Sequence, residues 1–307
     1  MNEDPLYQLN LNWEQISNSK RTQLLKTMPL IAAADYPTAR NAIVGLKVEK
    51  AVQAQLLGLL AARISRNEPE SGMALFDEAI AESLSCWWKT DRIRALGFIL
   101  QQLAQSHYRP KARALLKQVD TLCAGFQESA LSNQAEIDSI VNCLADLGVN
   151  LLRCGFGRPA TRYFKMALHW SERFHDPEPA RNFEARTAAY SRIAKKWAAG
   201  GQFCRALRIA KSIQSQTFNG LEYCNRESLR AQTLQYIGIQ LARNGQRRRG
   251  GRVLSLAARI VIADVHDFDR SRSDNLLRIS MSLEEIGLIK QARAFLTKAS
   301  QIAAGAP

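Results

Sequence analysis

The chain has 307 residues, of which 46% are hydrophobic and 23% charged, a composition ordinary for a folded globular protein. It excludes a disordered chain, a collagen-like fibre and a small disulfide-built domain. The 42 Lys and Arg residues outnumber the 28 Asp and Glu residues, and the net charge of +14 favours an acidic partner, which includes acidic proteins, nucleic acids and anionic membrane surfaces.

The N-terminal segment predicts capping helices before any repeat begins. Its first residues, Met1–Pro5, are acidic and lack the basic-then-apolar pattern of a secretory signal. Pro29 and Pro37 are expected to interrupt the helices, and Ala39 and Ile43 have helical spacing after Asp35. We therefore expect residues 1–50 to form one or two helices that cap residues 51–307.

From residue 51 onward, apolar residues recur at helical spacing and strand signals are almost absent. Residues 51–89 predict a helix pair that turns near Asn67, with Pro69 starting its second helix. The most apolar stretches, Ala51–Ile64 among them, are shorter than the ~20 residues that a membrane span needs. We expect an all-α chain without a membrane span.

A repeat of two helices around a tight turn follows. The predicted turn residues are His107, Gly155, Gly201, Gly245 and Gly287, spaced by 48, 46, 44 and 42 residues. Small residues occur seven before and five after most of these turns, as at Gly238 and Gly250 around Gly245. Small side chains let two antiparallel helices approach closely, and a turn glycine adopts the left-handed conformation readily. Replacing Gly238 with Leu should therefore destabilise the fold by overpacking.

This pattern resembles the tetratricopeptide repeat, most clearly over Leu144–Ala167 and Leu234–Gly245. The spacing is longer than the ~34 residues usual for that repeat, and the terminal proline of the motif is missing, so the resemblance is to the extended-repeat branch of the superfamily. It implies a right-handed αα-superhelix, a tetratricopeptide-like α-solenoid of about six helical hairpins. It also implies ligand binding on a concave groove lined by the first helix of each hairpin.

Residue types common in active sites and metal sites are present, but not in the spacing of a known catalytic or ligand-binding motif. The histidines lack metal-ligand spacing, and no nucleophile, P-loop or dinucleotide motif occurs. We therefore expect no enzyme activity, no metal and no cofactor. The cysteines form no C-x-x-C pair and lie within helical patterns, so we expect reduced, buried thiols in a cytoplasmic protein. They are Cys86, Cys123, Cys143, Cys154, Cys204 and Cys224.

The positive charge belongs mainly to the C-terminal half of the repeats. Residues 181–307 hold 22 basic and 9 acidic residues, whereas residues 1–90 hold 9 and 10. Its densest point is the run Gln246–Arg252 directly after the Gly245 turn. Arginine guanidinium groups suit phosphates or clustered carboxylates. With the groove positions that the resemblance implies, the residues expected to contact the partner are Arg153, Lys195, Arg205, Arg208, Gln235, Arg243, Arg247, Arg248, Arg249 and Arg252.

These features predict a non-enzymatic scaffold, adaptor or chaperone-like regulator that binds an acidic protein or peptide through its groove and basic C-terminal half. The alternative is an RNA-binding or single-strand-binding helical-repeat protein. Aromatic platforms for stacking bases are sparse, because Trp197, Tyr190 and Tyr236 fall at or next to core positions. The pair Trp87–Trp88 should have at least one exposed face, where it would mark a contact surface or cover a junction between repeats.

Overall fold

The computed structural model describes residues 18–33, 35–126, 134–174, 179–213, 217–218, 221–222, 226–263 and 269–305. The chain divides into two compact units. Unit 1 is Met1–Ser132 with Asp146–Tyr163, and unit 2 is Asn133–Ala145 with Phe164–Pro307. Helices α7 (Gln134–Arg153) and α8 (Gly157–Ser171) each contribute residues to both units.

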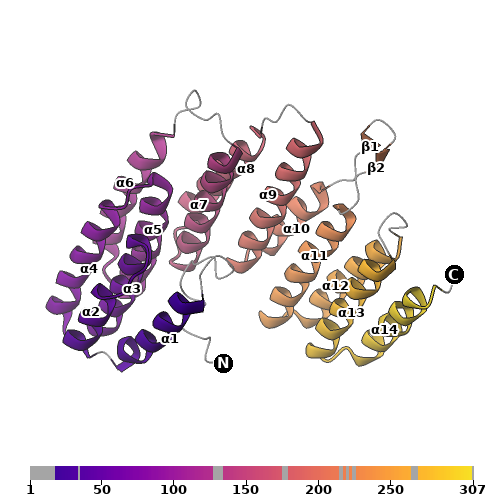
Figure 1. Cartoon of the computed structure of the whole chain (residues 1–307), viewed down its shortest axis with the longest axis horizontal. Helices are drawn as coiled ribbons and strands as arrows, with labels where there is room; N and C mark the ends of the chain where they lie inside the picture. The colour runs from indigo at the N-terminus through magenta and orange to yellow at the C-terminus, as the bar shows by residue number, and fades with distance from the viewer. Residues whose placement is uncertain are drawn as a thin grey trace. The chain divides into compact units, whose positions relative to one another are not determined.

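Helices account for most of the described residues, which confirms the all-α prediction (Figure 1). The remaining helices of unit 1 are α1 (Asn18–Ala33), α2 (Tyr36–Val44), α3 (Lys50–Ile64), α4 (Pro69–Leu84), α5 (Lys89–Gln105) and α6 (Arg109–Ala124). Unit 2 contains α9 (Pro179–Ala199), α10 (Phe203–Ser212), α11 (Arg226–Arg243), α12 (Arg247–Ala263), α13 (Asp269–Glu285) and α14 (Ile289–Ala303). The strands β1 (Thr217–Phe218) and β2 (Leu221–Glu222) pair antiparallel between α10 and α11.

The core of unit 1 is centred on α3, which contacts α1, α2, α4 and α5. Its residues are buried nearly all round, as expected of a helix with neighbours on several sides. A Cβ placed on Gly58 would lie 2.9 Å from the Ile99 side chain, so α3 and α5 approach closely at this point.

The two N-terminal prolines differ in their effect. Pro37 lies in the first turn of α2, after the N-cap Asp35, whose side chain accepts a hydrogen bond from the Thr38 N–H at 3.5 Å. Pro29 lies inside α1, so the expected interruption there is wrong. The buried positions Leu24 and Ile31 continue across the proline, and their burial favours an unbroken helix despite the missing N–H.

The five predicted turns share one backbone arrangement. The turn residues adopt left-handed φ angles of 69° at His107 and 74° to 81° at the glycines. The residue after each turn donates its N–H to the carbonyl five positions earlier, as Gln246 does to Leu241 at 2.9 Å. This is the bond of a Schellman cap, which satisfies a carbonyl at the end of the preceding helix. The turn prediction is therefore confirmed, including the histidine that occupies a position usually given to glycine.

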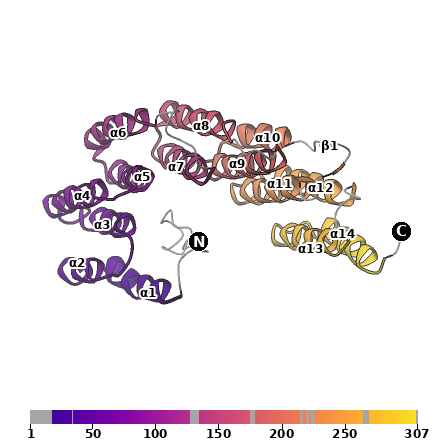
Figure 2. The ribbon, with the colours of Figure 1, turned by 45° about the horizontal axis from the view of Figure 1, so that its top comes forward.

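In unit 2, α11 and α12 meet at the small residues that the repeat pattern singled out. A Cβ on Gly250 would lie 2.6 Å from the Gly238 carbonyl oxygen, and a Cβ on Gly238 would lie 2.8 Å from the Leu254 side chain. Further contacts join α9 to α11 and α11 to α13. In Figure 2, α10, α12 and α14 follow one another along one side of α9, α11 and α13.

Among the described residues, no helix is both long enough and apolar enough to cross a bilayer.

Candidate functional site

The arginine run at the start of α12 divides into two pairs. Arg247 Nη2 donates to the Gly287 carbonyl at 2.5 Å. Arg249 Nη1 donates to Gln246 Oε1 at 3.1 Å, and its Nη2 lies 3.3 Å from Cys204 Sγ. Arg248 and Arg252 are exposed and have no hydrogen-bond or ion-pair partner within the described residues. Arg247 and Arg249 therefore contribute to the structure of unit 2, while Arg248 and Arg252 remain available to a ligand.

The predicted groove residues of α9 and α11 are engaged within unit 2. Gln235 Nε2 donates to Ser282 Oγ at 2.9 Å, which links α11 to α13. Lys195 is half-buried, and burial, followed by repulsion from Arg192, lowers the pKa of its ammonium group. At the end of α11, Arg243 forms an exposed ion pair of 3.1 Å with Glu285. Gln235 and Arg243 thus both join α11 to α13 and stabilise the unit.

Arg205 and Arg208 lie on α10 and are both exposed. The Arg205 guanidinium lies 4.8 Å from the ring centroid of Trp197, whose ring is buried and stacks on Phe164. A cation held over an aromatic face is restrained in position while its outer edge stays in water. Arg153, at the C-terminal end of α7, is exposed and belongs to unit 1.

The helices of unit 2 differ in whether acidic residues accompany their exposed cations. Helices α10, α12 and α14 contain no Asp or Glu at all. In contrast, α13 carries both signs, with Asp274, Glu284 and Glu285 among its residues. Leaving out Arg247, which bonds to Gly287, we call the other exposed cations of α10, α12 and α14 the basic face: Arg205, Arg208, Lys211, Arg248, Arg252, Arg259, Lys290 and Arg293.

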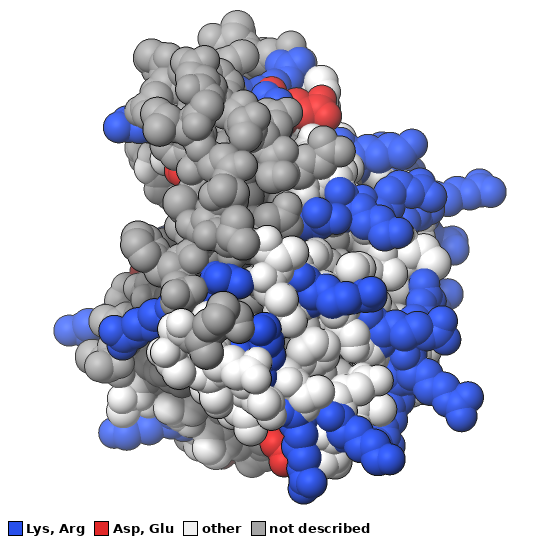
Figure 3. Space-filling view, turned by 90° about the vertical axis from the view of Figure 1, so that its right-hand side faces the viewer, with Lys and Arg blue, Asp and Glu red and all other residues white. Residues whose placement is uncertain are grey.

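Side-chain contacts hold the three helices of the basic face next to one another. The Arg249–Cys204 contact joins α12 to α10. Ser255 Oγ lies 3.4 Å from Gln291 Oε1 and joins α12 to α14. Figure 3 shows lysine and arginine side chains gathered on this end of the chain, with few acidic side chains between them.

Sequence reasoning missed Lys290 and Arg293, because α14 has no arginine run to attract notice. The available signal was the absence of acidic residues from every second helix after α9. That signal becomes meaningful only when these helices are known to lie side by side.

Large apolar side chains are scarce on the basic face. The exposed ones in unit 2 are Leu277, Met281, Ile289 and Leu296. None of these four belongs to α10 or α12, where the large apolar residues at the surface are half-buried. Ile289 and Leu296 lie on α14.

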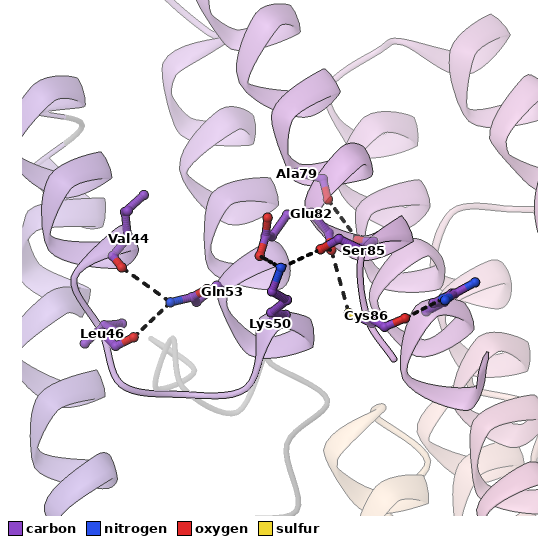
Figure 4. A network of polar contacts seen from close by, with 10 residues as sticks. Val44, Leu46, Lys50, Gln53, Ala79, Glu82, Ser85 and Cys86 are labelled. Atoms are coloured by element: carbon purple, nitrogen blue, oxygen red, sulfur yellow. Dashed lines mark hydrogen bonds and ion pairs between the residues drawn. The ribbon is translucent and has the colours of Figure 1, made fainter. Parts of the chain in front are cut away.

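A separate exposed feature lies in unit 1, between α4 and α5. Trp87 and Trp88 are 85% and 67% exposed, so both rings of the predicted pair are accessible. Lys50 Nζ contacts Ser85 Oγ at 3.1 Å and Glu82 Oε1 at 3.6 Å (Figure 4). These bonds fix the connection that carries the two tryptophans.

The cysteine prediction is confirmed at four positions and wrong at one. Cys86, Cys123, Cys143 and Cys154 are buried free thiols. Cys204 is exposed, because α10 buries Phe203, Ala206 and Ala210 and turns Cys204 outward. Cys224 lies outside the described residues. Within the described ranges, no group of three or more His, Cys, Asp and Glu side chains is placed to hold a metal ion.

Comparison with family models finds none that matches this chain. Comparison with curated proteins also finds no match. Among solved structures, the chain is similar to the crystal structure of Ton1535 from Thermococcus onnurineus NA1, with 12% sequence identity and a TM-score of 0.46. The alignment covers 92% of this chain and 98% of that one.

Proposed function

We propose that this chain is a non-enzymatic binding scaffold of the tetratricopeptide-like superfamily, which captures an acidic partner on the basic face of unit 2. In this proposal, about six helical hairpins stack into a right-handed superhelix. The recurrent turns support it, since the same backbone bond follows His107 and the four turn glycines.

The observation that carries the proposal is the absence of acidic residues from α10, α12 and α14. Like charges on adjacent helices repel one another, so clustering them without counter-charges lowers the stability of the free protein. A bound anion removes this repulsion and gains charge-assisted hydrogen bonds to the arginines. The clustered positive charge therefore destabilises the free protein and stabilises its complex with an anionic ligand.

An acidic protein segment and a nucleic acid are the two partner classes that fit such a field. Both supply several negative charges at spacings that arginines on neighbouring helices reach. An adaptor or chaperone-like role corresponds to the first class, and the scarcity of exposed apolar side chains on α10 and α12 favours the second.

Binding of a fluorescent polyglutamate of about 20 residues tests whether the basic face captures polyanions at all. The informative variant is Arg248→Glu with Arg252→Glu, since neither side chain has a partner within the described structure. Its matched control, Arg270→Glu with Arg278→Glu, makes the same change in net charge on exposed arginines of α13.

We expect the basic-face variant to weaken binding at least tenfold and the control to weaken it less than threefold. Equal weakening by both variants would mean that net charge alone attracts the polyanion, and the proposed face would then be wrong. Circular dichroism of both variants checks that each remains helical.

A further inference from the structure

We infer that the ligand of the basic face is double-stranded nucleic acid, held through its phosphate backbone without reading of base sequence. This inference rests on the proposed function and specifies its partner. Three features of the described part of unit 2 carry it: the chemistry of the exposed side chains, the absence of exposed aromatic rings from α10 and α12, and the length of α12.

The exposed chemistry differs from that of a protein-binding surface. The core of a protein–protein interface is depleted in charged residues and enriched in buried apolar and aromatic anchors. On α10 and α12 the exposed large side chains are cationic, and the exposed large apolar residues described in unit 2 lie on α13 and α14. Interfaces with nucleic acids are much more positive than those with proteins. An acidic protein would find charge on these helices but no apolar anchor.

The aromatic content argues against a single strand. Proteins that bind single strands without sequence preference stack the bases on exposed aromatic rings. Helix α12 contains no aromatic residue, Phe203 of α10 is buried, and Phe295 of α14 is half-buried. Trp197, beneath Arg205, is 3% exposed and stacked on Phe164, so its ring is not available to a base. A duplex presents its phosphates and keeps its bases stacked inside, and it needs no such platform.

The size of the face fits a short stretch of duplex. Helix α12 has 17 residues and is therefore about 25 Å long. Side-chain contacts join α12 to α10 and to α14, so cations of all three helices lie near this length. A duplex carries one phosphate charge per about 1.7 Å of its axis, both strands counted, hence about fifteen over 25 Å, of which only those on one side face the protein. A duplex laid along α12 would therefore present several phosphates to the cations of the basic face.

Arg205 of the basic face and Arg249 beside it are held in place before any ligand arrives. Arg205 rests on the Trp197 ring, and Arg249 is fixed by Gln246 and by contact with Cys204. Side chains that are already ordered lose less entropy on binding than free ones. The basic face therefore combines a restrained cation, Arg205, with exposed ones such as Arg248 and Arg252.

The test measures binding of the full chain to a labelled 20-base-pair duplex DNA of arbitrary sequence at several NaCl concentrations. The variant Arg208→Gln with Arg252→Gln removes one cation each from α10 and α12. The control Arg270→Gln with Arg278→Gln removes two exposed cations from α13. Both carry the same net charge.

We expect wild-type affinity to fall steeply with salt, in proportion to the number of phosphates contacted. The basic-face variant should bind at least tenfold more weakly at about 100 mM NaCl, with a salt slope less steep by about 2. The control should keep the wild-type slope, and a second duplex of unrelated sequence should bind within threefold of the first.

Three probes separate the failure of this inference from failure of the proposed function. Tighter binding of a 20-nucleotide single strand than of the duplex would overturn the assignment to double-stranded nucleic acid. Capture of polyglutamate without capture of any nucleic acid would also overturn it, yet would leave the acidic-partner function standing. Absence of binding to all probes would overturn both. A duplex RNA of the same length tells whether the backbone contacts depend on helix form.

Discussion

Cys123 and Cys154 are buried, and burial raises the pKa of both thiols to about 12. The thiolate is the reactive form, so these two cysteines should be inert in the folded protein. Cys204 is exposed beside Arg249 and should react with iodoacetamide. Alkylation at pH 8, mapped by mass spectrometry, should modify Cys204 well before Cys123 or Cys154. In urea all three should react alike, and rapid native modification of Cys123 would contradict the burial argument.

Two tryptophans offer a similar contrast in stability. Trp197 is 3% exposed and stacks on Phe164 at a centroid distance of 3.9 Å. Replacing it with Ala should lower the free energy of unfolding by about 3–5 kcal/mol, because a large cavity opens and the stacking is lost. Trp87 is 85% exposed, and its replacement should change stability by about 0.5 kcal/mol or less. Urea unfolding followed by circular dichroism measures both, and equal effects would show that exposure does not govern these sites.

At the scale of the elements, three glycines have distinct roles that one substitution can separate. Gly250→Ala should be strongly destabilising, since its Cβ would lie 2.6 Å from the Gly238 backbone oxygen and α11 and α12 would have to separate. Gly245→Ala meets open space but requires a φ of +79°, and should cost about 1 kcal/mol. Gly157→Ala meets neither obstacle and should be nearly neutral.

Thermal unfolding of the three variants should therefore rank them as Gly250, Gly245 and Gly157, from most to least destabilised. A neutral Gly250→Ala would mean that the α11–α12 contact yields easily. A neutral Gly245→Ala would mean that the left-handed turn is not required for the hairpin.

At the scale of the whole molecule, the net charge of +14 should make stability depend on salt. Screening weakens repulsion between exposed charges, and the Debye length falls from about 30 Å at 0.01 M to about 8 Å at 0.15 M. We expect the Tm to rise between about 20 and 300 mM NaCl. The Arg208→Gln, Arg252→Gln variant should have a higher Tm than wild type at low salt and a smaller rise. A Tm that falls with salt would mean that ion pairs such as Arg243–Glu285 outweigh the repulsion.

Several features of the fold were predictable because they depend on local physics. The left-handed turns at Gly201, Gly245 and Gly287 follow from residue type and helical spacing, and the small residues at Gly238 and Gly250 follow from the repeat. The helix through Pro29 was not predictable from local propensity, because burial of its neighbours outweighs the lost hydrogen bond.

The region of the candidate site was predictable from the sequence, but the residues that belong to the site were not. Arg248 and Arg252 were expected to bind a partner and are exposed, whereas Gln235 bonds to Ser282 within unit 2. Arg247 bonds to Gly287, a residue 40 positions away along the chain. The order of residues in the sequence does not show which arginine bonds to the turn of a neighbouring helix pair.

By itself, the sequence determined the helical class, the turns and the C-terminal location of the charge, because helical periodicity, glycine conformation and residue counts are local or additive properties. Only the tertiary structure decided which cations share a surface, because each helix must first be rotated to bury its apolar stripe. Burial of Phe203, Ala206 and Ala210 directs Cys204, Arg205 and Arg208 outward. Contacts of α10 with α12, and of α12 with α14, then bring these side chains near the remaining cations of the basic face.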